Sequence, residues 1–381
     1  MRGMGRMNTA GLGGQGANAD TGTGTGGAAL QRAVAHWHGR QRRALALATL
    51  LLCCAVLASL SLGVQSAPPA QVLRELASLL PGLEAWGDPG SAQREVLLRL
   101  RMPRTAMGLV CGASLAMAGV AMQGITRNPL VSPYTIGISP AAAFGASIAI
   151  LLGWSSEPGT GMYWTVALAF VSALLCAVGV LALTTLRSVN AVVLVLAGVA
   201  FTYLFAALTA TVQFVASEQQ LAAIVHWTFG SLNGRSWAEV WVAGGVWLAC
   251  LPVLWCSAGA LNAFSAGGDD VAASLGVSVV RTRALVTLAA VLSSAAVVSF
   301  TGVIGFVGLV APHIARLLIG GDHRVLLPFA GLVGALLVLV ADMVGRLAFA
   351  PVIVPVGIVI AYVGVPLFLH LLLTRRNGMA E

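Results

Sequence analysis

The sequence predicts an all-α integral membrane protein with about ten transmembrane helices. Of its 381 residues, 58% are hydrophobic and only 9% are charged, a composition far outside that of water-soluble domains. Apolar windows long enough to cross a hydrocarbon core of about 30 Å recur along the chain. Ten such windows can be counted, at residues 44–64, 103–124, 135–153, 162–185, 190–215, 239–258, 283–302, 304–320, 325–348 and 354–374.

The amino-terminal segment, residues 1–43, is predicted to be disordered and cytoplasmic. It is rich in Gly, Ala, Thr and Asn and shows no apolar periodicity. The first window, 44–64, could be mistaken for a signal peptide, but its length of about 20 residues fits a spanning helix better. The spanning domain then covers residues 44–376 and is followed by a short carboxyl-terminal tail, 377–381.

The distribution of arginine predicts the orientation in the membrane. An even number of spans places both termini on one side, and cytoplasmic termini put fourteen arginines in inner segments and seven in outer ones. The positive-inside rule favours this orientation. Five outer arginines crowd between residues 74 and 104, which indicates that something outside binds positive charge. They are Arg74, Arg94, Arg99, Arg101 and Arg104.

Two outer segments, residues 65–102 and 216–238, are long enough to fold on the membrane surface. The second contains LAAIVHWTFGSL, which predicts a short interfacial helix with Trp227 and Trp237 as anchors. The main inner loop is residues 259–282.

The inner loop contains GGDDVAASLGV, which predicts a short amphipathic helix in the cytoplasm. Two carboxylates, Asp269 and Asp270, precede the helical pattern, as the amino terminus of a helix prefers, and Gly276 closes it, as a carboxyl-terminal cap prefers. A simple re-entrant connector between the sixth and seventh spans is the alternative.

Two breaks in the helical pattern are predicted from Gly and Pro. In RNPLVSP, residues 127–133, a turn separates the second and third spans, and Ser132 can cap the helix that follows. The glycines spaced by three in GVIGFVG predict close helix approach and an irregular turn between the seventh and eighth spans. We expect both breaks to be structural; a binding loop at the first is the alternative.

Several function classes are excluded by composition. All 21 basic residues are arginine, so a Walker-type ATP site and a Schiff-base lysine are both excluded. The net charge of +8 is scattered between apolar windows, which argues against nucleic acid as a partner. The six cysteines show no C-x-x-C spacing, so neither a disulfide framework nor a zinc site is expected.

Charged residues inside the spans are expected to be few. We expect Asp342 to be the one acid inside a span, and its i, i+4 spacing from Arg346 predicts a structural ion pair. An intramembrane enzyme needs paired acids, a Ser/His pair or a metal cluster, and an ion-coupled transporter needs unpaired buried acids. We therefore expect no catalytic residue, no metal and no cofactor bound by this chain.

Five stretches occur in a characteristic order. Through them the chain, from about Arg99 to Leu373, resembles the FecCD-type permeases of bacterial ABC importers for iron chelates, haem and cobalamin. They are RLRMPRTAMGLVCGASLAMAGVAMQ, RNPLVSPYTIGIS, WTFGSL, GDDVAASLGV, and GVIGFVGLVAPHIARLLIGGDHRVLLP with ADMVGRLAFAPVIVPVGIVIAYVGVPLFLHLLL.

This resemblance implies the type II ABC importer permease fold and a set of partners. These are a second copy in a homodimer around a central path, two cytoplasmic ABC ATPase subunits that bind ATP and Mg²⁺, and a periplasmic substrate-binding protein. The location implied is the bacterial inner membrane, with several spans in contact with lipid. Among iron chelates, haem and cobalamin we expect an iron-containing chelate, haem or a ferric siderophore, because that is the commonest use of such permeases. Cobalamin is the alternative, and an ion-coupled secondary transporter is the alternative of a different class.

The resemblance also implies roles for two groups of residues. Arginines matching Arg101, Arg104 and Arg346 face acidic residues of the binding protein in this family; the alternative is that they only anchor helix ends in the interface. The inner helix becomes the candidate coupling contact with the ATPase. Its residues are Asp269, Asp270, Ala272, Leu275 and Gly276.

Overall fold

The computed structural model describes residues 23–63, 66–88, 90–186, 191–348 and 350–375, which form helices and loops without a strand. Seven of the described helices are long and apolar enough to cross a membrane, and three shorter apolar helices complete the ten that the windows predict. The all-helical fold with ten spans is confirmed. The ten are α1 (Thr23–Ser61), α4 (Met102–Thr126), α5 (Ile138–Leu151), α6 (Gly161–Leu186), α7 (Ala191–Val215), α9 (Trp237–Cys256), α11 (Val279–Thr301), α12 (Val307–Ile319), α13 (His323–Leu347) and α14 (Val356–Arg375).

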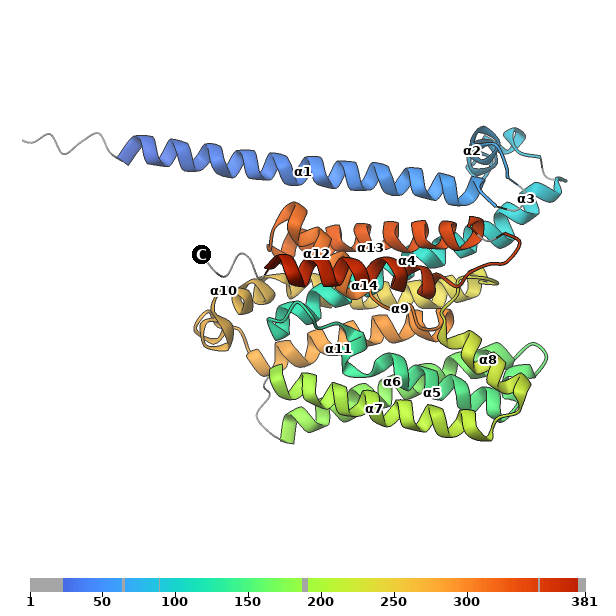
Figure 1. The fold of residues 1–381 in the computed structure, drawn as a ribbon. Helices are drawn as coiled ribbons and strands as arrows, with labels where there is room; N and C mark the ends of the chain where they lie inside the picture. The colour runs from blue at the N-terminus through green and yellow to red at the C-terminus, as the bar shows by residue number, and fades with distance from the viewer. Residues whose placement is uncertain (1–22, 64–65, 89, 187–190, 349, 376–381) are drawn as a thin grey trace, which may run out of the picture. The chain divides into compact units, whose positions relative to one another are not determined.

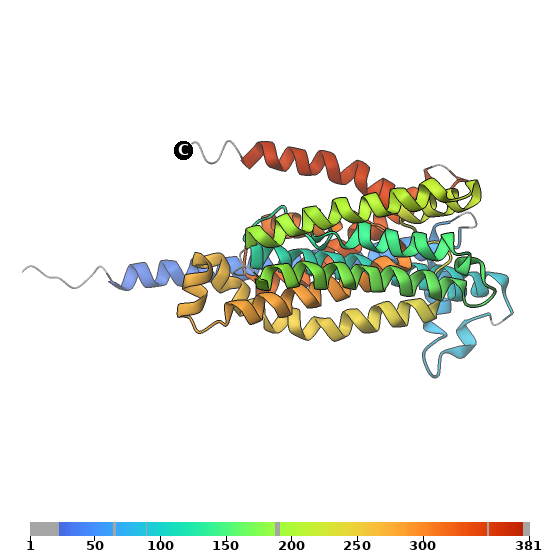
Figure 2. The same ribbon diagram turned by 90° about the horizontal axis from the view of Figure 1, so that it is seen from below.

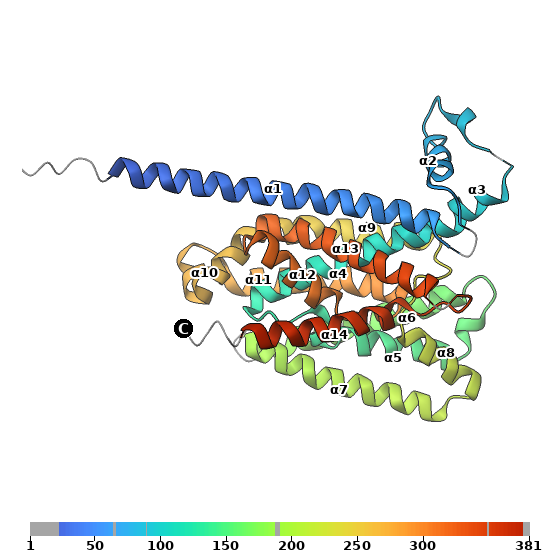
Figure 3. The ribbon, with the colours of Figure 1, turned by 45° about the horizontal axis from the view of Figure 1, so that its top comes forward.

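Short helices lie at opposite ends of the bundle. Figure 1 shows α2, α3 and α8 at one end and α10 at the other, and the turned views keep this separation (Figure 2, Figure 3). The predicted outer segments and the predicted inner loop therefore lie at opposite ends. The short elements are α2 (Pro69–Ala77), η1 (Glu84–Trp86), α3 (Ala92–Val96), the π-helical turn η2 (Leu97–Arg101), η3 (Pro133–Ile136), η4 (Trp154–Ser156), α8 (Glu218–Thr228) and α10 (Ala258–Ser274).

The interior of the bundle is built on α4, α11 and α13. Among the seven long helices these have the largest buried share, whereas α6 and α7 are mostly exposed. Lipid tails are as apolar as leucine, so spans associate through close packing at small residues rather than through hydrophobic burial. At the crossing of α4 and α13, a Cβ atom on Gly112 would lie 2.3 Å from the carbonyl oxygen of Gly334. Only glycine permits this approach.

The prediction of disorder up to residue 43 is wrong for the part that the structure describes. The helix α1 begins at Thr23, so Thr23–Arg43 is helical. Extending a helix is far easier than nucleating one, and AALQRAVA, just before the span, consists mostly of good helix formers. Residues 1–22 and the predicted tail, 377–381, lie outside the described residues.

Both predicted breaks are present. The helix α4 ends where Arg127 adopts the left-handed conformation, and Ser132 then caps η3 in a reciprocal capping box with Thr135. The helix α11 ends at Gly302, whose φ is 72°. A Cβ atom on Gly302 would lie 2.3 Å from the Trp227 carbonyl oxygen, so the turn requires glycine.

The predicted interfacial helix corresponds to α8. It begins at a capping box between Ser217 and Gln220 and contains Trp227. The second expected anchor, Trp237, instead starts α9, and its indole Nε1 donates a hydrogen bond to the Leu98 carbonyl oxygen at 3.0 Å. This indole therefore ties α9 to the π-helical turn η2.

Candidate docking and coupling sites

The outer end of the bundle brings together the three arginines predicted to dock a binding protein. Arg101 ends η2, Arg104 lies in the first turn of α4, and Arg346 lies in the last turn of α13. These elements are far apart in the chain. The fold nevertheless places all three guanidinium groups around the carboxyl end of α1 and the carboxylate of Asp342.

Asp342 lies at the centre of this cluster and is buried. Its carboxylate accepts hydrogen bonds from Arg104 Nη2 at 2.8 Å and from Arg104 Nε at 3.1 Å. Arg346 Nε lies 3.1 Å from the second carboxylate oxygen, so the i, i+4 pair predicted from the sequence is present. One buried carboxylate thus compensates two guanidinium groups, and the cluster keeps a net positive charge.

Arg101 and the remaining donors of Arg346 bind carbonyl groups at the carboxyl end of α1. Arg101 Nη1 donates to the carbonyl oxygens of Leu60 at 2.7 Å and Ser61 at 3.2 Å, and Arg346 Nη1 donates to that of Leu62 at 3.1 Å. The last carbonyl groups of a helix lack partners within the helix, and its carboxyl end attracts cations. These arginines therefore fasten the first span to the bundle.

This geometry bears on the docking prediction. The side chains of Arg104 and Arg346 are only 12% and 10% exposed, and both have acceptors within the chain. Exposed positive charge at this end lies instead on Arg74 and on Arg99, whose side chain is 77% exposed. The contacts match the anchoring alternative, and docking to a binding protein stays a prediction.

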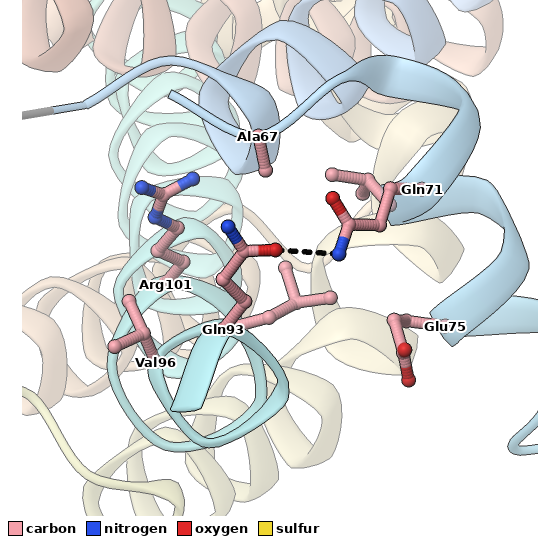
Figure 4. A pocket seen from close by; sticks show the side chains of 8 residues that line it. Ala67, Gln71, Glu75, Gln93, Val96 and Arg101 are labelled. Atoms are coloured by element: carbon pink, nitrogen blue, oxygen red, sulfur yellow. Dashed lines mark hydrogen bonds between the residues drawn. The ribbon is translucent and has the colours of Figure 1, made fainter. Parts of the chain in front are cut away.

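A hollow at the same end lies between α2 and the α3–η2 segment (Figure 4). The buried carboxylate of Glu75 binds Arg94 Nη1 at 2.6 Å, and the side-chain amide of Gln71 donates a hydrogen bond to the side-chain oxygen of Gln93. Figure 4 shows Glu75 and Arg101 on opposite sides of this hollow. The two contacts hold the outer segment together, and neither has a sequence signal because its partners lie on two different helices, 19 and 22 positions apart.

The inner end is dominated by α10, which consists of two helical parts joined at Gly268, with φ 83° and ψ −158°. This φ lies in the left-handed region that side chains rarely adopt, so the break also requires glycine. The second part, residues 269–274, is the predicted short helix, and it is followed by Gly276 in the left-handed region.

The predicted coupling residues differ in their surroundings. Asp269 binds Arg283, whereas Asp270 is exposed. Ala272 is fully buried against the bundle, and Leu275 is 67% exposed. The second part of α10 therefore has one packed face and one open face that carries a large apolar side chain. Its role in contacting an ATPase stays a prediction.

The first part of α10 is tied to the start of α13 by Asn262. Its amide Nδ2 donates to Asp322 Oδ1 at 2.7 Å, and its Oδ1 accepts from the backbone N–H of His323 at 2.9 Å. Partial burial opposes ionisation of Asp322, but hydrogen bonds from Asn262 and from the Arg324 backbone N–H hold the pKa of this carboxyl below its ordinary value. Asp322 is therefore an ionised N-cap of α13.

Sequence reasoning missed two buried charges. The expectation that Asp342 is the one acid inside a span is wrong, because Glu239 is buried in the first turn of α9 and binds Arg235 at 3.0 Å. Its i, i+4 spacing from Arg235 was an available signal. Arg283 is one of the fourteen inner arginines that indicated only orientation, yet its side chain is buried and pairs with Asp269, 14 positions away on a different helix, a contact that no i, i+3 or i, i+4 spacing indicates.

Comparisons with known proteins agree with this architecture. The model of the FecCD transport family matches residues 50–374. The molybdate import system permease protein of Haemophilus influenzae is 35% identical over 340 residues, which cover 87% of this chain and 96% of that protein. The vitamin B12 import system permease protein of Salmonella typhi is 37% identical over 309 residues, which cover 79% and 92%.

A solved structure also shares the fold. It is a metal-chelate type ABC transporter in an inward-facing conformation, and it superposes with a TM-score of 0.75 at 31% identity. The match covers 87% of this chain and 99% of that chain.

Proposed function

The chain belongs to the FecCD transport family as the permease subunit of an ABC importer, and on that premise we propose that it carries a metal chelate into the cytoplasm. The proposed substrate is an iron-containing chelate, either haem or a ferric siderophore. Cobalamin is the second candidate, favoured by the similarity to the vitamin B12 permease.

The observation that carries the substrate class is the distribution of charge in the central spans. After Arg104, α4 contains no charged residue; after Arg283, α11 contains none; and between Arg324 and Asp342, α13 contains none. A small oxyanion is held by cationic groups or by dense hydrogen-bond donors along its path. A bulky chelate of low net charge needs neither, so these spans suit it better.

Family membership implies an ATPase and a substrate-binding partner. We propose a homodimer in a bacterial inner membrane, with two ATPase subunits at the α10 end and the binding protein at the α2 end. The ATPases supply the ATP and Mg²⁺ site, since the chain has no lysine for a Walker motif. The positive-inside rule, with fourteen arginines in the predicted inner segments and seven in the outer ones, supports a cytoplasmic placement of the loop that contains α10.

The proposed ATPase contact is the open face of the second part of α10. Val271 and Leu275 are both exposed there, on a helix outside the spans. Exposed apolar side chains on a helix bounded by Gly268 and Gly276 suit a groove on a partner protein.

Uptake by the assembled importer tests the substrate proposal. The permease, purified with its ATPase and binding protein and reconstituted in liposomes loaded with ATP, would be offered a ferric siderophore, haem, cobalamin and molybdate separately. We expect ATP-dependent uptake of an iron chelate and none of molybdate. Uptake of cobalamin alone would establish the second candidate, and uptake of molybdate alone would contradict the metal-chelate proposal.

A further inference from the structure

We propose that Arg283 is a positioning residue that ties the second part of α10 to the inner ends of α4 and α11. Through it, a displacement of this helix by an ATPase would reach the two most buried of the long spans. The inference rests on the proposed contact between α10 and an ATPase. Within that contact it assigns different roles to Asp269 and Asp270, which the sequence pattern does not distinguish.

The contacts of Arg283 join three elements. The residue lies in the second turn of α11, and its side chain is 3% exposed. Its Nη2 atom lies 2.8 Å from Asp269 Oδ1 on α10 and 3.5 Å from the carbonyl oxygen of Ile125, near the end of α4. Its Cζ atom lies 5.7 Å from the centre of the Phe264 ring, on the first part of α10. A buried arginine with this set of contacts is held in one place.

The position of the break in α10 makes this tether necessary. Gly268 interrupts the helix between Phe264 and Asp269, so the backbone alone does not make the two parts one rigid rod. Arg283 contacts a residue on each side of the break. The first part is held independently at the start of α13 by Asn262. Without the arginine, the second part keeps its covalent link but loses its charged contact with α11.

The two spans joined through Arg283, α4 and α11, pack against each other. Both α4 and α11 have most of their apolar length buried in the bundle, and they contact each other extensively. Packed helices of this kind move as units rather than deforming continuously. A displacement applied at Asp269 is therefore passed to the spans instead of being absorbed in the loop.

Two adjacent carboxylates provide a matched comparison. Asp269 faces Arg283 although its own side chain is 42% exposed, whereas Asp270 is exposed in the same turn. Removing either one changes the charge offered to an ATPase by the same amount. Only the removal of Asp269 breaks the tether.

The test measures uptake and ATP hydrolysis in the same liposomes that contain the assembled importer. We expect Asp269→Ala to reduce the number of substrate molecules moved per ATP by about fivefold, while assembly and ATP hydrolysis remain. Asp270→Ala should match wild type, and Asp269→Glu, which keeps a carboxylate within reach, should restore most of the ratio. Arg283→Met removes the buried cation, whereas Asp269→Ala leaves it without its carboxylate. We expect Arg283→Met to lower the number of substrate molecules moved per ATP as Asp269→Ala does.

The outcomes separate this inference from the proposed function. If Asp269→Ala and Arg283→Met lower uptake and hydrolysis in equal proportion, the residues are only structural and the inference is overturned. If Leu275→Asp blocks ATPase assembly while Asp269→Ala behaves like Asp270→Ala, the contact stands and the tether alone is wrong. If Leu275→Asp leaves assembly and uptake unchanged, the proposed contact itself fails, and the inference fails with it.

Discussion

Asp342 shows how a single buried carboxylate organises the outer end of the bundle. It compensates Arg104 and Arg346, which approach from different elements, and it frees the other donors of Arg346 for the end of α1. Removing one member of a buried ion pair leaves an uncompensated charge, which costs far more than the loss of an exposed pair. The contribution of this residue is therefore chiefly to stability.

Replacing Asp342 should destabilise the protein strongly. Asp342→Asn keeps the shape of the side chain but removes the negative charge, and we expect the free energy of unfolding in detergent to fall by about 3 kcal/mol. The matched control is Glu95→Gln, because Glu95 pairs with Arg99 where both side chains are exposed. That change should cost no more than about 0.5 kcal/mol. Equal losses in the two variants would refute the central position of Asp342.

The docking prediction is tested best at Arg101, whose described bonds go to carbonyl oxygens rather than to Asp342. Arg101→Glu should weaken binding of the external binding protein by about fivefold and reduce the dependence of binding on salt. Arg99→Glu makes the same charge change at an exposed position nearby. If Arg101→Glu leaves affinity unchanged, Arg101 serves only to anchor α1; if both variants weaken binding equally, the positive surface acts as a whole.

At the scale of elements, the crossing of α4 and α13 depends on glycine. Gly112→Leu would place side-chain atoms where the Gly334 carbonyl group now lies, so the two spans must separate. We expect a loss of about 3 kcal/mol in the free energy of unfolding, together with aggregation in size-exclusion chromatography. Gly245→Leu on α9, where a Cβ atom would meet nothing within 4 Å, is the control and should change stability by less than about 0.5 kcal/mol.

The second part of α10 is the element on which energy coupling depends. Leu275→Asp should leave membrane insertion intact because Leu275 is exposed and outside the spans. The added charge should prevent the ATPase subunits from co-purifying with the permease, while Leu275→Met should behave like wild type. Normal assembly and transport by Leu275→Asp would mean that the contact lies elsewhere, with the loops around Arg127 and Arg324 as the next candidates.

The sequence predicts the elements better than their contacts. Hydropathy windows locate the ten apolar helices because the bilayer demands long apolar stretches, although three of the ten are shorter than a full span, and Gly and Pro locate the breaks. Contacts with a helical spacing, such as Asp342 with Arg346, were also accessible. The pairing of Arg104 with Asp342 joins residues 238 positions apart, and no local pattern encodes it.

At the start of α1, the sequence failed to predict an element rather than a contact. Composition predicted disorder up to residue 43, whereas the helix begins at Thr23. A span already nucleated by the membrane lowers the cost of adding further helical residues in front of it. The composition of residues 1–43 alone takes no account of the apolar span that follows them.

At the scale of the whole molecule, the bundle of residues 45–381 has two chemically distinct ends, and the middle parts of α4, α11 and α13 between them carry no charged residue. Arg101, Arg104 and Arg346 lie together at one end, and exposed Val271 and Leu275 lie on α10 at the other. Figure 1 shows α10 at the end of the bundle opposite α2 and α3. Asp342 and Glu239, two carboxylates buried in the spans, both bind arginine. This arrangement suits a permease driven by a separate ATPase, and it lacks the unpaired acids of an ion-coupled carrier in the part of the chain described.

The most direct measurement compares the purified chain alone with the assembled importer in the same liposomes, with ATP, a proton gradient or a sodium gradient supplied in turn. We expect the chain alone to hydrolyse no ATP and to accumulate no substrate under any of these conditions, and the assembled importer to accumulate substrate with ATP only. ATP hydrolysis by the chain alone, or accumulation driven by an ion gradient without ATP, would contradict this account.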